Sequence, residues 1–167
     1  MHSTIQIRLL IELYLSAFQS VLRGPDPEGA DRAAPRLDDG TPLLRGEELS
    51  LFGWVTGHPR LGDRRISTSA LIHVTEDLQW ARTLSRWYRL GVPFAVDTSE
   101  AFPDMALAGY CVALGTEVLS LPLHATRQIT NKRPQLMADK AFELGFDNIV
   151  PALTRLSLVW PPVVVKN

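Results

Sequence analysis

The N-terminal segment places apolar side chains at helical spacing. In residues 4–22 they recur every three or four positions, as on one face of an α-helix, with Arg8 and Glu12 on the opposite face. Ser3 is suited to cap the start of this helix, and Gly24 to end it. The apolar stripe is wide, so it must pack on the body of the protein or on a second copy of the chain. Its members are Ile5, Leu9, Leu10, Leu13, Tyr14, Ala17, Phe18, Val21 and Leu22.

The pattern changes between residues 24 and 46. Gly, Pro, Asp and Ala dominate there, and Leu37 is the only large apolar residue before Leu43. Such a composition predicts a flexible linker, or a loop pinned at a few points. A second interpretation is a peptide that becomes ordered on a partner.

Residues 48–91 predict a β module. Short runs of β-branched and aromatic residues, such as 53–56 and 66–74, are separated by turn residues. For 75–90 the pattern allows two structures. One is a pair of short strands, and the other is a single helix capped by Thr75. Periodicity alone does not separate them.

The last third of the chain predicts mainly helical structure over 99–158. The segment Ser99–Leu114 is expected to be helical at least in part, and Glu117–Leu121 forms a strand. Pro134 opens a further helix, because proline is favoured in the first turn. Asp147 is suited to cap the last one.

Length and composition agree with one α+β domain spanning residues 1–167. A chain of this size buries enough surface to fold without a disulfide or a metal. We expect a small antiparallel β unit packed with the N-terminal helix and the C-terminal helices. The single Cys111 is expected to be a buried core residue, and it fits a reducing, cytoplasmic location. Polar residues interrupt the first helix, so we expect it to belong to the folded protein and not to a membrane.

Three short motifs stand in residues 53–91. They are a Gly57-His58-Pro59 turn, a Thr68-Ser69 pair and a closing Tyr88-Arg89-Leu90-Gly91. In this order they resemble a small uncharacterised module of proteobacterial chromosomal, plasmid and prophage proteins. The resemblance covers about a quarter of the chain. It implies a compact β unit, which favours strands for 78–90, and an origin in a mobile element or phage. It implies no activity and no catalytic residue.

Arginine and aromatic residues interleave within the β module. Between residues 54 and 91 bases exceed acids by three, whereas residues 1–50 hold three more acids than bases. Guanidinium groups bind phosphate bidentately and aromatic rings stack on bases, so this composition predicts a nucleic-acid or partner-binding surface. The simpler interpretation is that the rings are core and the arginines are solvated. The candidate residues are Arg60, Arg64, Arg65, Arg82, Arg86, Trp87, Tyr88 and Arg89.

Nothing in the sequence points to a catalytic or metal site. The histidines lie at no metal-ligand spacing, and we expect His58 to hydrogen-bond backbone in its turn. We expect the hydroxyls of 67–69 to bond backbone as well, because no nucleophile elbow surrounds them. Phosphate-loop and dinucleotide fingerprints are missing from the sequence. We therefore predict no cofactor, no metal and no catalytic residue.

Three hypotheses for function follow. The first is a non-enzymatic binding or regulatory protein, an accessory or anti-defence factor of a mobile element or phage. Such a protein would bind another protein, or form a homodimer, through the first helix and the apolar tail from Leu158 to Val165. The simpler interpretation is that the tail packs on the N-terminal helix and completes the core. The alternative is a nucleic-acid-binding protein that uses the arginines and aromatic residues. The third, an enzyme, requires His58 or His73 beside a carboxylate in a polar pocket.

Overall fold

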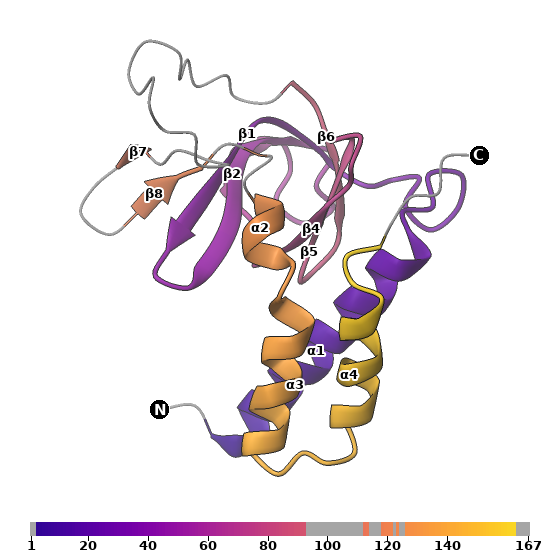
Figure 1. Ribbon diagram of the computed structural model, residues 1–167. Helices are drawn as coiled ribbons and strands as arrows, with labels where there is room; N and C mark the ends of the chain where they lie inside the picture. Colours follow the sequence, from indigo (N-terminus) through magenta and orange to yellow (C-terminus); the bar gives the residue numbers. More distant parts are fainter. Residues whose placement is uncertain (1–2, 93–111, 114–117, 122, 124–125, 163–167) are drawn as a thin grey trace.

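The computed structural model describes residues 3–92, 112–113, 118–121, 123 and 126–162. A curved sheet packs against a layer of three longer helices, joined to it by a short fourth (Figure 1). The chain thus has the predicted α+β class. The helices are α1 (Thr4–Arg23), α2 (Thr126–Thr130), α3 (Arg133–Glu143) and α4 (Val150–Leu158). The strands are β1 (Arg36–Arg45), β2 (Glu48–Thr56), β3 (Arg64–Ser67), β4 (Leu71–Val74), β5 (Trp80–Thr83), β6 (Trp87–Leu90), β7 (Val112–Ala113) and β8 (Val118–Ser120).

The sheet curls because its two ends are tied together. Its strand order is β3-β2-β1-β6-β5-β4, with β8 also paired to β1 and β7 to β8. The outermost strands of that path, β3 and β4, are joined only by residues 68–70. The N–H of Thr68 donates to the carbonyl of Leu51 at 2.8 Å, and that of Leu84 to Ala70 at 2.8 Å. The sheet therefore bends into a partly closed barrel.

Residues 36–45 form the central strand β1, so the prediction of a linker or loop over 24–46 is wrong for this half. The strand pairs with β2 along most of its length and with β6 and β8 on its other edge. Asp39 takes a positive φ of 51°, and the register shifts between Asp38 and Thr41, where Gly40 lies. The turn-like Asp-Gly pair marks a bulge within a strand that long-range pairing holds together.

The sheet also differs from the predicted antiparallel unit over 48–91. Strand β1 runs parallel to β6, so the sheet is mixed, and β1, β7 and β8 lie outside 48–91. Strands β5 and β6 confirm the two-strand prediction for 75–90 and exclude the helix. Leu78 in the β4–β5 turn has a positive φ of 56°, which no α-helix contains.

The helix predictions hold in part. The Ser3 hydroxyl accepts from the N–H of Gln6 at 3.3 Å, and the Gln6 side chain accepts from Ser3 at 2.9 Å, which completes a capping box. Helix α4 has Ile149 at its N-cap and no side-chain cap, so the capping role predicted for Asp147 is wrong. In 99–158, the described residues include two strands besides the helices. Cys111 and most of Ser99–Leu114 lie outside the described residues.

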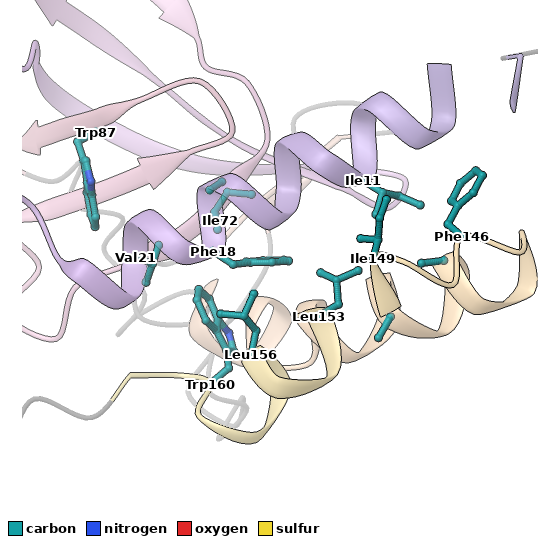
Figure 2. Close-up of a cluster of buried hydrophobic side chains, with 13 residues drawn as sticks. Ile11, Phe18, Val21, Ile72, Trp87, Phe146, Ile149, Leu153, Leu156 and Trp160 are labelled. Atoms are coloured by element: carbon teal, nitrogen blue, oxygen red, sulfur yellow. The ribbon is translucent and has the colours of Figure 1, made fainter. Parts of the chain in front are cut away.

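Two apolar cores lie on opposite faces of the sheet. Leu37, Leu51, Leu71 and Tyr88 belong to the core inside the barrel. The second core lies between the sheet and the helices (Figure 2). There Phe18 of α1 meets Trp160, with ring centroids 5.1 Å apart. The second core comprises Ile11, Ala17, Phe18, Val21, Ile72, Trp87, Ala138, Ala141, Phe146, Ile149, Leu153, Leu156 and Trp160.

Leu37→Ala tests whether β1 is a structural strand and not a linker. Leu37 is 1% exposed, so the truncation leaves a cavity in the barrel core. We expect the free energy of unfolding to fall by roughly 2 to 5 kcal/mol. Denaturant titration measures it, with Leu136→Ala as the matched control because Leu136 is 57% exposed. Equal stability of the two variants would contradict the strand.

Candidate binding surfaces

The predicted arginines and aromatic residues do not form one surface. Adjacent strand residues point to opposite faces, and Trp87 and Tyr88 follow that rule. Trp87 is 4% exposed in the core beneath the helices, and Tyr88 is 2% exposed in the barrel core. Both rings are therefore structural, as in the simpler interpretation of the sequence.

Arg82 and Trp87 connect the sheet to α1. Arg82 Nε and Trp87 Nε1 donate to the same hydroxyl, Ser20 Oγ, at 3.2 and 3.1 Å. Burial lowers the pKa of Arg82, while nearby Asp31 favours its charged form. These two side chains fix the position of α1 on the sheet. Their polar groups are already bonded within the fold, so they are poor candidates for binding a ligand.

Arg86, Tyr88 and His58 gather near the β2–β3 turn. The His58 ring stacks on Tyr88 with centroids 6.5 Å apart. Its Nδ1 accepts from the N–H groups of Arg60 and Leu61 at 3.2 and 3.1 Å, which confirms the predicted turn role. Partial burial, followed by the charges of Arg86 and Arg60, lowers the pKa of His58.

Arg89 is exposed, but its guanidinium group already makes contacts within the fold. Its guanidinium lies over the Trp80 ring, 5.2 Å from the centroid, and donates to the carbonyl of Arg32 at 3.2 Å. This contact holds the turn-rich segment before β1 against the sheet. Arg89 therefore has a structural task, like Arg82.

The remaining predicted residues, Arg60, Arg64 and Arg65, are exposed around the β2–β3 hairpin. None of them takes part in the ion pairs found among the described residues. Two exposed rings that the predicted site omits share this hairpin, Phe52 at 37% and Trp54 at 44% exposure. Their signal was the alternation of β2, in which the buried Leu51, Gly53 and Val55 leave positions 52 and 54 outside.

Helix α1 buries only part of its apolar stripe. Phe18 and its neighbours face the helical core (Figure 2). Ile5, Leu9 and Leu13, spaced four residues apart, are 72%, 54% and 54% exposed. We call these three residues the α1 ridge. The ion pair between Arg8 and Glu12, 3.0 Å long, lies beside the ridge on the same helix.

The length and hydropathy of α1 would also allow it to cross a membrane. Among the described residues it is the one helix that meets this criterion, and core helices of globular proteins meet it too. The packing of its other face on α3 and α4 accounts for part of its apolar character.

The apolar tail, for which the sequence left open an interface or packing on the N-terminal helix, is divided. Trp160 is buried, and its Nε1 donates to the carbonyl of Thr130 at 3.2 Å, so it completes the core. Leu158 and Val159 are 80% and 56% exposed. Residues 163–165 lie outside the described residues. Leu22 and Val159 line an open groove between α1 and α4.

The two described histidines have no carboxylate partner among the hydrogen bonds and ion pairs of the described residues. His73 is 7% exposed and meets the Trp160 ring edge-on at 5.5 Å. Burial, and to a lesser degree the charge of Arg127, lower its pKa to about 4. Thr68 Oγ1 accepts from the N–H of Leu51 and donates to the carbonyl of Ser69, as expected for a structural hydroxyl.

The fold and these surfaces define an α+β protein with an apolar helix ridge on one layer and a basic, aromatic hairpin on the other. A model described as a family of unknown function, DUF6634, matches residues 7–140, so the chain belongs to this family. Neither the curated proteins nor the solved structures contain a match to the chain.

The buried His73 predicts a loss of stability in mild acid. Its pKa of about 4 lies below the ordinary 6.5, so the unfolded chain binds the proton more tightly. This contribution is complete above pH 6.5 and is lost as the pH falls from 6.5 to 4, by roughly 3 kcal/mol. Denaturant titration across this range measures the loss.

His73→Leu removes the titrating group. The free energy of unfolding of this variant should therefore depend much less on pH between 6.5 and 4. His58→Asn is the matched control, because it changes a histidine outside the core and keeps an acceptor in the turn. Identical slopes for wild type and His73→Leu would show that another group causes the loss.

Proposed function

We propose that this chain is a non-enzymatic binding or regulatory protein that holds another protein on the α1 ridge. The observation that carries the proposal is the exposure of Ile5, Leu9 and Leu13 on one helical face. Residues four apart on a helix are neighbours, so their side chains make one continuous apolar strip. Apolar strips bordered by polar residues are typical of protein interfaces, since burying them releases ordered water.

The surroundings of the ridge also suit a helix-in-groove or helix-on-helix contact. The capping box fixes the start of α1, and the Ser20 hydrogen bonds fix its far end on the sheet. A partner therefore meets a helix that is already ordered, and binding loses little conformational entropy. Leu10, which is 44% exposed, widens the strip on one side.

We further propose that the protein acts as an accessory or anti-defence factor of a mobile element or phage. The resemblance of residues 53–91 to plasmid and prophage modules supports this origin. The partner is then a host or element protein in the cytoplasm.

The double variant Leu9→Glu with Leu13→Glu tests the ridge. Carboxylates in an apolar interface are costly to desolvate, so partner recovery should fall by about tenfold or more. Tagged wild type and variant are purified from the native host, and the bound proteins are identified and quantified. The thermal midpoint should stay close to that of wild type, because both leucines are exposed.

Leu136→Glu with Phe142→Glu is the control, since these residues are 57% and 70% exposed on α3. Equal partner recovery from all three proteins would refute the proposal. A second result against the proposal would come from size-exclusion chromatography of the purified chain. If wild type is a dimer and only the Leu9 and Leu13 variant is a monomer, the ridge binds a second copy of the chain.

The second candidate is a nucleic-acid-binding protein. The observation in its favour is the hairpin carrying Arg60, Arg64 and Arg65, all exposed, with Arg65 directly opposite Trp54 on the paired strand. Guanidinium groups in this setting bind phosphates and release counterions, so binding must weaken with added salt. The other predicted arginines contribute less, because Arg82 and Arg89 are engaged within the fold.

Alanine at all three hairpin arginines tests this candidate. Wild type should bind a short labelled oligonucleotide with an affinity that falls steeply between about 50 and 200 mM salt. The variant should bind weakly, and its slope against log salt should be smaller by about 2. The charge-matched control replaces Arg8, Arg45 and Arg155, also exposed, by alanine. Salt-independent binding, or equal loss in both variants, would reject the candidate.

A further inference from the structure

Phe52 and Trp54 form an exposed aromatic pair on the outer face of β2. They lie two positions apart on one strand, so both rings point away from the barrel, about 7 Å apart along the strand. Strand β3 pairs with this part of β2 and places Arg65 opposite Trp54 and Ser67 opposite Phe52. Directly paired residues share a face, so the guanidinium and the two rings lie on one surface.

The backbone under this pair is held rigidly. Gly53 stands between the two rings, and a Cβ there would lie 2.6 Å from the carbonyl oxygen of Asp38. Only glycine allows β2 to come this close to the bulge of β1, where the register shifts between Asp38 and Thr41. Bulges increase the local twist, and this one lies in β1 directly opposite the segment of β2 that carries Phe52 and Trp54.

The charge around the pair is positive. Arg60 and Arg64 are exposed on the same hairpin as Arg65. Two carboxylates also lie in this region: Asp38 stands opposite Trp54 on β1 and pairs with Arg36 at 2.9 Å, and Asp63 of the hairpin accepts from the N–H of Gly57 at 2.8 Å. In residues 52–67 of the hairpin, the three guanidinium groups outnumber the one carboxylate. Aromatic rings beside unpaired guanidinium groups suit a ligand with flat rings and phosphates.

We propose that Phe52 and Trp54 stack two successive bases of a single-stranded nucleic acid whose phosphates contact Arg65, with Arg60 and Arg64 of the same hairpin adding positive charge. This inference rests on the second candidate function and names its site and substrate. The two rings stand about twice as far apart as neighbouring bases in a B-form strand, which are separated by about 3.4 Å. A strand must therefore be extended to use both rings. In a duplex the base faces are already stacked, so duplexes gain nothing from this pair.

Fluorescence anisotropy with a labelled oligothymidine, and with a duplex of equal length, tests the site. Wild type should prefer the single strand. Trp54→Ala and Phe52→Ala should each weaken single-strand binding by about tenfold, in the range measured for one base stack. Their salt slopes should match wild type, because stacking releases no counterions. Arg65→Ala should instead reduce the slope by about 0.7.

Phe142→Ala is the matched control, because this phenylalanine is 70% exposed on α3. It should bind as wild type does, and thermal midpoints verify that every variant is folded. Loss of binding only in the arginine variants, with both ring variants unaffected, would overturn the stacking site and leave the nucleic-acid function standing. Equal affinity for duplex and single strand would also overturn it. The absence of any binding would reject both.

Discussion

The double use of strand β1 is the constraint on which the rest of the structure depends. One edge of β1 pairs with β2 over nearly its whole length. The other edge is divided, since Arg36 and Leu37 pair with β6 whereas Leu43 to Arg45 pair with β8. The bulge at Asp38–Thr41 lies between these two halves. The bulge bends β1 at the point where its partner changes from β6 to β8, and the sheet curls at this point. The short 68–70 connection then joins the far edges.

Much of the helical layer could be predicted from sequence, because its information is local. Periodicity located α1, and Ser3 with Gln6 supplied its cap. Proline in the first turn marked α3. The strand β1 could not be predicted in this way. Its Asp-Asp-Gly-Thr-Pro core has the composition of a turn, and only pairing with residues far along the chain makes it a strand.

The candidate surfaces show the same division between local and long-range information. Composition located the arginines and rings in one module, but not which face each occupies. Trp87 and Tyr88 were candidates for the binding surface, but a core lies on each side of β6 and buries both rings. The α1 stripe was too wide for one partner, and the structure shows which part remains exposed. Trp54 is exposed because its side of β2 has no helix packed on it among the described residues.

The two proposed surfaces belong to different layers of a mechanically joined unit. Ser20 on α1 receives hydrogen bonds from Arg82 and Trp87 of the sheet, and Arg133 of α3 donates to the carbonyl of Leu71 at 2.7 Å. These hydrogen bonds fix the position of the helical layer on the sheet. The exposed surfaces of the two layers differ, since one is apolar and the other is basic. The contact proposed for the α1 ridge would rely on apolar burial, which salt does not screen. The contact proposed for the β2–β3 hairpin would rely on guanidinium charge, which salt weakens steeply. The two proposals do not compete, since the ridge and the hairpin share no side chain.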